Sequence, residues 1–172
     1  MEWAKKNSLV DHYVYLAISS SLKVGITRHN QIPTRWIDQG AIKAIRIAKV
    51  PYRQLSGLIE VELKKYYSDK TNWRKMLTNN IDENIDLIAE RNRAHKLLKK
   101  SFEEYLIDDE ITEINYPVIK YPDKVNSINL DKTPMFEGKL MGIKGQYLIF
   151  DNNSVFNIRK HSGYYVEIEL LQ

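Results

Sequence analysis

The pattern of apolar and polar positions predicts several strands and a short helix in the first third of the chain. Two short apolar runs, residues 13–18 (YVYLAI) and 22–27 (LKVGIT), flank three serines and predict a β-hairpin. Pro33 suits the first turn of a short helix over residues 33–37, because its missing N–H would be unpaired there. Residues 41–50 predict a third strand, although their alternation slips once.

Helical spacing follows this strand. Leucine, isoleucine and tyrosine recur every three to four positions across residues 54–67 and predict a helix, which gives the order β-β-α-β-α. Residues 69–77 are polar and aromatic, typical of a loop that leads into more helix. A longer helix is predicted within residues 81–106.

Strand patterns dominate after residue 110, where the composition changes. Glycines and an Asn-Asn pair separate the runs, and strands at this spacing favour a small barrel or sandwich. We therefore predict an α+β protein with an α/β domain and helical extension over residues 1–110 and a small all-β domain over residues 111–172. The predicted strands are residues 112–119, 124–130, 137–143, 146–150, 154–159 and 164–170.

Charge is distributed unevenly along the 172 residues. Residues 1–80 carry 14 Lys and Arg against 6 Asp and Glu, residues 81–115 carry 5 against 10, and residues 116–172 carry 7 against 6. A basic first half suits a polyanion such as nucleic acid, DNA or RNA, although a solvated lysine-rich surface has the same composition. The acidic middle is either an ordinary helix face or a surface that opposes the basic half.

Some protein classes are disfavoured by composition. The chain has no cysteine, which excludes disulfides and Cys-ligated zinc. It has no apolar run near the ~18 residues that cross a bilayer, and its first six residues lack the apolar stretch of a signal peptide. We expect a cytoplasmic protein without a membrane partner.

Five polar or special residues occur in a suggestive order: Tyr15, Gly25, Arg35, Glu60 and Asn72. Their order and spacing resemble the GIY-YIG endonuclease superfamily across residues 12–77. The resemblance implies a small three-stranded antiparallel sheet flanked by helices. It also implies that Tyr15 ends the first triplet, that Gly25 ends the second, and that an arginine and a glutamate follow on successive helices.

Several segments also resemble a bacterial family of unknown function within that superfamily. They read VYLA, KVGITR, IPTRWIDQGA and DKTNWRKML, and the β-rich tail is similar too. Members of that family are often longer and can carry a cysteine-containing segment ahead of this part. Membership in such a family supplies no activity by itself.

The resemblance implies a chemistry that suits these residue types. Arg35 would grip phosphate oxygens with its planar fork, and Glu60 would hold one Mg²⁺ or Mn²⁺ ion. Tyr15 would position the attacking water. Together they would form a metal-dependent phosphodiesterase, with Arg28 and Asn72 as further phosphate contacts.

One position departs from the superfamily. Lys23 stands where the second triplet has a tyrosine, and a protonated lysine cannot accept a proton from water. Lys23 could contact phosphate as a point charge, or act as a base if burial beside a positive charge lowers its pKa. The substitution fits phosphate binding without cleavage, so a non-catalytic nucleic-acid-binding module is the first alternative. A protein–protein adaptor is the second.

Every candidate also has a purely structural interpretation. Tyr15 lies in an apolar strand and suits the core, while Gly25 suits a bulge or a tight backbone approach. Arg35 and Glu60 suit a solvated surface, and Asn72 suits the N-cap of the next helix. The hypothesis of a site therefore depends on whether Tyr15, Arg35 and Glu60 line a common cleft.

Overall fold

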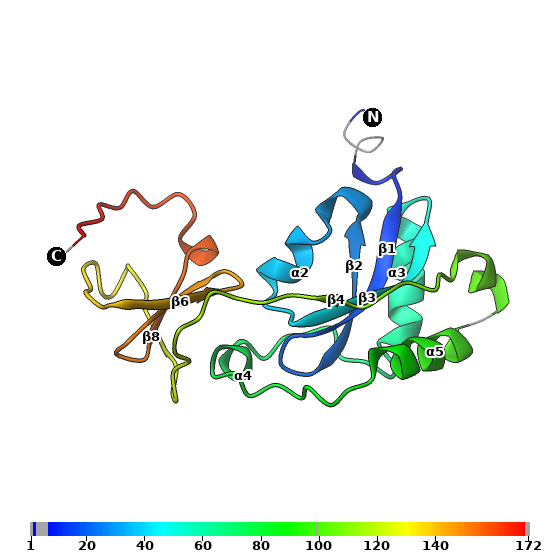
Figure 1. The fold of residues 1–172 in the computed structure, drawn as a ribbon. Coiled ribbons are helices and arrows are strands. Elements are labelled where there is room, and N and C mark those ends of the chain that lie inside the picture. The colour runs from blue at the N-terminus through cyan, green and yellow to red at the C-terminus, as the bar shows by residue number, and fades with distance from the viewer. Residues whose placement is uncertain (1, 3–6, 99, 171–172) are drawn as a thin grey trace.

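The structure is a computed structural model that describes residue 2, residues 7–98 and residues 100–170. Residues 1 and 3–6, on which the expectation of no signal peptide rests, lie outside the described residues. The described chain forms two four-stranded sheets side by side (Figure 1). Among the described residues, no helix is long and apolar enough to cross a membrane.

The first sheet contains the predicted hairpin and the predicted third strand. Its order is β2-β1-β3-β4, and every neighbouring pair is antiparallel. The hairpin register pairs Tyr15 with Gly25 and Ala17 with Lys23. A bulge between β1 and β3 shifts the register beside Tyr15. The strands are β1 (His12–Ile18), β2 (Leu22–Arg28), β3 (Lys43–Val50) and β4 (Thr112–Glu113).

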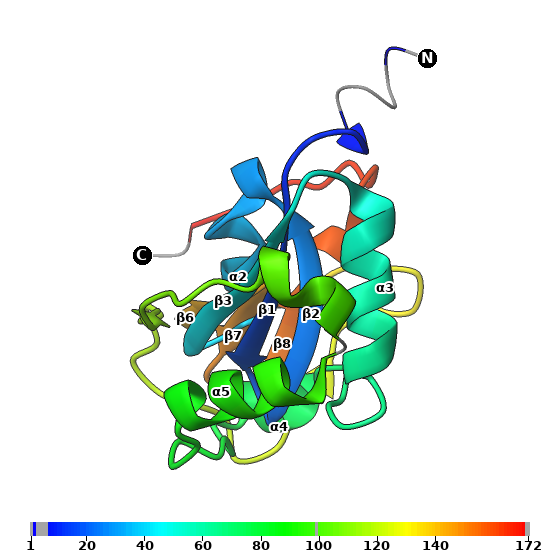
Figure 2. The same cartoon turned by 90° about the vertical axis from the view of Figure 1, so that its right-hand side faces the viewer.

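Helices cover both faces of this sheet. In Figure 2, α3 and α5 lie in front of the strands and α2 lies behind them. A short 3-10 turn, η1, joins β2 to α2, and a second, η2, follows α5. The elements are η1 (His29–Gln31), α2 (Thr34–Asp38), α3 (Arg53–Leu63), α5 (Leu87–Leu97) and η2 (Lys100–Tyr105).

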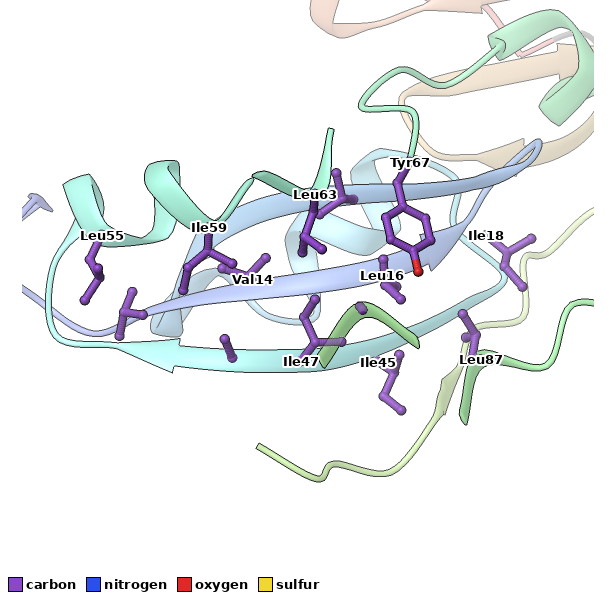
Figure 3. Close-up of a cluster of buried hydrophobic side chains, with 14 residues drawn as sticks. Val14, Leu16, Ile18, Ile45, Ile47, Leu55, Ile59, Leu63, Tyr67 and Leu87 are labelled. Carbon is purple, nitrogen blue, oxygen red and sulfur yellow. The ribbon is translucent and has the colours of Figure 1, made fainter. Parts of the chain in front are cut away.

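The main core lies between the sheet and α3 (Figure 3). Leu16 and Ile45 from the sheet and Ile59 and Leu63 from α3 are fully buried. Each such side chain contributes about 1.5–3 kcal/mol through removal from water. A smaller cluster on the opposite face packs Trp36 of α2 against the ring of Tyr15. Adjacent strand residues therefore serve different cores, as their alternation predicts.

The second sheet has the order β5-β8-β7-β6, with β5 and β8 parallel. The short helix α4 (Trp73–Leu77) packs on it: Met76 and Leu77 join Ile149 and Val155 in one buried cluster. Trp73 stacks on Tyr147 with ring centroids 5.7 Å apart. The elements are β5 (Asn126–Ser127), β6 (Leu140–Lys144), β7 (Tyr147–Phe150), β8 (Ser154–Asn157) and η3 (Arg159–His161).

The prediction of an α+β fold is confirmed, and two finer expectations are corrected. The first sheet has four strands rather than three, because Thr112 and Glu113 pair with the start of β3. The C-terminal strands do not close into a barrel in the described part of the chain; they form a single open sheet. The predicted strand 112–119 is divided between the two sheets: residues 112–114 bond to β3 and its approach, and residues 117–119 bond to β6, where Val118 forms an isolated bridge with Gly142. Of the predicted strand 124–130, only Asn126 and Ser127 form a strand.

Two further elements differ from prediction. The helix predicted within residues 81–106 is divided: Asp86 caps the start of α5 through the N–H groups of Ile88 and Ala89, and Leu98 is extended. Residue 99 lies outside the described residues. The segment 164–170, predicted as a strand, belongs to no strand. Periodicity predicts which faces are apolar, but a strand also needs a neighbour to bond with.

The division at residue 110 stays a prediction. Contacts between the two parts are numerous in the described chain. Tyr116 donates a hydrogen bond of 2.9 Å to the carbonyl of Ala41, and Arg159 forms an ion pair of 3.0 Å with Asp38. Because α2 also carries Arg35, the second sheet helps to hold the helix that carries a candidate site residue.

Candidate functional site

The ring of Tyr15 lies directly across Gly25 on the neighbouring strand. A Cβ atom at position 25 would sit 2.6 Å from both Cζ and the hydroxyl oxygen of Tyr15, closer than real Cβ contacts allow. Glycine is therefore required so that the tyrosine can lie flat on the sheet and carry its hydroxyl toward β2. The other side of the ring meets Trp36 edge-on, with centroids 5.9 Å apart.

One side-chain oxygen joins two of the candidate residues. The Tyr15 hydroxyl donates to Oε1 of Gln39 at 3.2 Å, and the Lys23 ammonium donates to the same oxygen. Tyr15 is 1% exposed and Lys23 is 4% exposed. Gln39, the C-cap residue of α2, is therefore the shared hydrogen-bond partner of this buried pair.

Lys23 is a buried cation beside another cation. Burial, together with the positive charge of Arg35, lowers the pKa of its ammonium to about 8, against the opposing effect of Asp69. Lys23 and Arg35 are therefore neighbouring positive charges that repel each other, and neither forms an ion pair with a carboxylate in the described part of the chain. An anion there would stabilise both.

Arg35 and Glu60 approach Tyr15 from different helices. Burial raises the pKa of the Tyr15 hydroxyl, the charge of Arg35 opposes that rise, and the charge of Glu60 adds to it. Arg35 lies on α2 and is exposed, whereas Glu60 lies on α3 and is partly buried. The structure thus brings Tyr15, Lys23, Arg35 and Glu60 into one electrostatic neighbourhood at the β2 side of the sheet.

Glu60 already has a cationic neighbour. Its Oε2 lies 3.4 Å from the ammonium of Lys64, one turn later on α3, and that ammonium also lies 3.0 Å from Asp69. The side chain of Lys64 is 37% exposed, so this ion pair is accessible to solvent and weak. A cation or a substrate group can replace Lys64 at little cost.

Two predicted phosphate contacts have other partners in the structure. Arg28 ends β2 and, by alternation, faces the opposite side of the sheet from Lys23, where it donates to the side-chain oxygen of Asn7. Asn72 is the N-cap of α4: its Oδ1 accepts from the N–H of Lys75 at 3.2 Å. This contact matches the structural interpretation of Asn72 as a cap.

Comparison with known protein families gives one result. The family model described as "Protein of unknown function (DUF2797)" matches residues 1–166. The chain belongs to the DUF2797 family. Comparisons with curated proteins and with solved structures found no match. In this DUF2797 chain the geometry of the site therefore carries the functional argument.

Gln39 is the residue that sequence reasoning missed in the DUF2797 chain. An uncharged glutamine at the end of a short helix gave no chemical signal, and the resemblance assigned it no role. A weak signal existed, because Gln39 follows Arg35 by four positions and side chains at that spacing lie on one side of a helix. Only the β1–β2 register shows that this side meets Tyr15 and Lys23.

A hollow in the described part of the DUF2797 chain is adjacent to the site. It has a volume of about 550 Å³ and borders α3 and the free side of β2. Of the neighbouring residues Tyr15, Lys23, Arg35 and Glu60, only Glu60 lines this hollow. Among the described residues, no group of three or more His, Cys, Asp or Glu side chains is placed to hold a metal ion. The lining residues are Ser8, Ile26, Arg53, Gln54, Gly57, Leu58, Glu60 and Val61.

Proposed function

We propose that this chain binds the phosphodiester backbone of nucleic acid at Tyr15, Lys23 and Arg35. The observation that carries the proposal is the pair of neighbouring cations, Lys23 and Arg35. Neither forms an ion pair with a carboxylate in the described part of the chain. Phosphate supplies the negative charge that this place lacks.

The two cations would divide the work of binding. Arg35 is exposed and would offer its planar fork to two phosphate oxygens, whereas Lys23 would act as a point charge from below. The side-chain oxygen of Gln39 accepts a hydrogen bond from the Lys23 ammonium, and a bound phosphate would compete with that oxygen for the ammonium. The excess of 14 basic over 6 acidic residues in residues 1–80 would attract the polyanion from a distance.

We also propose that the site is of the GIY-YIG type and cleaves the backbone it binds. The approach of Glu60 and Arg35 to the Tyr15 hydroxyl supports this second proposal. One carboxylate is a donor set that suits Mg²⁺ or Mn²⁺, since these ions keep several waters and take phosphate oxygens as ligands. Glu60 would hold the ion, which would stabilise the charge that develops on the phosphate.

The protein groups would then handle water and its proton. Tyr15 would orient the attacking water through its hydroxyl. Lys23 could accept a proton only when neutral, and its pKa of about 8 makes that form abundant above pH 8. Cleavage should therefore rise with pH through about 8, in the same range in which binding by Lys23 weakens.

Binding is tested with labelled single-stranded and duplex DNA and RNA over a series of salt concentrations. Affinity should fall steeply with salt, and Arg35→Ala should reduce the slope by about one unit. The control is Lys132→Ala, which changes an exposed lysine between β5 and β6 and should leave the slope unchanged. No binding of any nucleic acid at about 50 mM salt would contradict the proposal and favour the protein–protein adaptor.

Cleavage is tested separately with single-stranded, duplex and branched substrates in Mn²⁺. The expected result is cleavage by the wild type and at least about a hundredfold less by Glu60→Gln, because a lost metal contact affects mainly the transition state. Salt-dependent binding with no cleavage would reject the endonuclease and leave the binding module. Equal cleavage by Glu60→Gln would reject Glu60 as the metal ligand.

A further inference from the structure

The side of β2 that faces away from β1 is partly open. The N–H of Val24 donates to the carbonyl of Ser68 at 2.8 Å, so alternate residues of β2 point their backbone groups outward. Ile26 has the same parity as Val24, and its outward groups bond to no other segment in the described chain. An unpaired strand edge can accept another strand.

A hollow lies where this edge meets α3. Ile26 forms one wall, and Gly57, Leu58 and Val61 form the other. Leu58 is 52% exposed and Val61 is 58% exposed, which is high for apolar side chains on a helix that also faces the core. Figure 2 shows α3 alongside β2, so a strand added to β2 would lie against α3. This is the geometry by which many domains bind an extended peptide.

No contact in the described part of the chain explains why residue 57 is a glycine. It lies inside α3, where glycine costs about 1 kcal/mol of helix stability relative to alanine. A Cβ atom added there would have no heavy atom within 4 Å. Packing inside the molecule therefore does not require glycine, whereas a partner backbone that approaches the hollow would.

The same chain carries a segment with the chemistry of the missing strand. Residues 164–170 (YYVEIEL) alternate apolar residues with Tyr165, Glu167 and Glu169. They form no strand, and Ile168 and Leu170 are 80% and 91% exposed. With the apolar side chains turned toward the hollow, the two glutamates would face away from it, toward solvent on the basic first half of the chain. Figure 1 places this segment at the opposite end of the molecule from α3.

We propose that the C-terminal segment 164–170 of one copy pairs with β2 of a second copy. Its apolar side chains fill the hollow between β2 and α3. The contact joins two different surfaces, so two copies can exchange tails reciprocally or copies can follow one another in a ring. The hollow shares Glu60 with the site proposed above, although the pairing of the two strands does not depend on nucleic-acid binding.

The proposal predicts self-association that depends on the hollow and on the tail. Self-association of the full chain is measured by light scattering at protein concentrations from about 1 to 500 µM, a range that detects dissociation constants in the micromolar range. Ile168→Glu should weaken association at least about tenfold, because it removes one buried apolar side chain. Met135→Glu, at a residue that is 87% exposed elsewhere, is the matched control and should change it less than about twofold.

A second pair of variants tests the hollow itself. Gly57→Leu fills it and should weaken association at least about tenfold, and Gly57→Ala, which adds one methyl group where the partner backbone approaches, should weaken it by a smaller factor. Both variants should unfold at or above the wild-type temperature, since each improves helix propensity. Association that is unaffected by Gly57→Leu would overturn the proposal.

Cross-linking shows which surfaces meet. The natural chain has no cysteine, so every link in a mixture of Leu58→Cys and Ile168→Cys copies involves only those two positions, and mass spectrometry distinguishes the 58–168 link from 58–58 and 168–168 links. A short bismaleimide should join them, and should not join Leu58→Cys to Met135→Cys. A chain that stays monomeric over the whole range, or that associates without the Leu58–Ile168 link, would overturn the proposal.

Discussion

Two buried lysines, one on each sheet, look alike and lie in different surroundings. Burial lowers the pKa of both Lys23 and Lys144 to about 8. Lys144 is fully buried: its ammonium lies 4.7 Å from the ring centre of Tyr121 and 5.6 Å from that of Tyr116, and it donates to Asn79 at 3.2 Å. Lys23 has one amide oxygen and a neighbouring arginine.

The comparison teaches that a lowered lysine pKa does not by itself identify a binding site. Aromatic faces supply negative potential to Lys144 and offset part of the cost of burying its charge, although burial still lowers its pKa. Lys23 has no aromatic face among its described contacts, and the charge of Arg35 adds to its own. The proposed function therefore assigns an outside anion to Lys23 and none to Lys144. Four experiments can break or sharpen this distinction.

The largest effect should come from the glycines that shape the two environments. A Cβ atom at Gly142, beside Lys144, would lie 2.7 Å from the Cα of Val118, whereas a Cβ atom at Gly25 would meet the end of the Tyr15 side chain. Backbone yields less than a side chain, so Gly142→Ala should lower the free energy of unfolding by about 3 kcal/mol and Gly25→Ala by about 1–2 kcal/mol. Urea unfolding measures both, and a larger cost for Gly25→Ala would contradict this account.

Stability should rise as pH increases from 8 to 10. In this range the unfolded chain keeps the lysine protons, with an ordinary pKa of 10.5, while the folded chain releases them at about 8. Each lysine should contribute about 2 kcal/mol to the rise. Urea unfolding of Lys23→Met and Lys144→Met across this range should show that each variant loses its own share. A wild-type stability that falls with pH would refute the lowered pKa values.

Nucleic-acid binding should separate the two lysines. Lys23→Met should weaken binding about tenfold at low salt, which corresponds to about 1.4 kcal/mol, because it removes one phosphate contact. Lys144→Met should leave affinity unchanged, since its ammonium is enclosed by Tyr116, Tyr121 and Asn79. Fluorescence anisotropy measures both. Equal losses would show that the two environments are not functionally distinct.

The smallest effect should come from Asn72. Because its side chain caps α4, Asn72→Ala should lower the free energy of unfolding by about 1 kcal/mol. Asn72→Asp keeps a capping oxygen and should retain most of that stability. If the cap is its whole role, binding by the alanine variant should equal that of the wild type at temperatures where both are folded. A binding loss in Asn72→Ala would return Asn72 to the phosphate contacts.

The sequence predicted the local parts of the fold well and the contacts between distant parts poorly. The hairpin, β3 and the helix around Ile59 follow from apolar spacing, which reports a buried face directly. The spacing around residues 164–170 is equally strand-like, yet that segment bonds to no sheet in its own chain. Likewise, no local pattern reports that Thr112 and Glu113 extend the first sheet.

The candidate site divides in the same way. Order and spacing selected Tyr15, Arg35 and Glu60, whose residue types carry chemistry wherever they lie. They could not exclude Arg28, because the predicted strand ended at residue 27 and the structure extends β2 to Arg28, which alternation turns to the other face. They could not include Gln39 either, because its role depends on the two donors, Tyr15 and Lys23, that the fold brings to its side-chain oxygen.

By itself the sequence determined the faces of the elements and the charge of the first half, since both are sums over neighbouring residues. The tertiary structure alone decided that Tyr15 lies across Gly25 and that Lys23 meets a glutamine and an arginine while Lys144 meets two tyrosines. The physical reason is that burial and charge compensation depend on which distant groups share a volume. That arrangement is fixed by packing and strand register, which no short stretch of sequence contains.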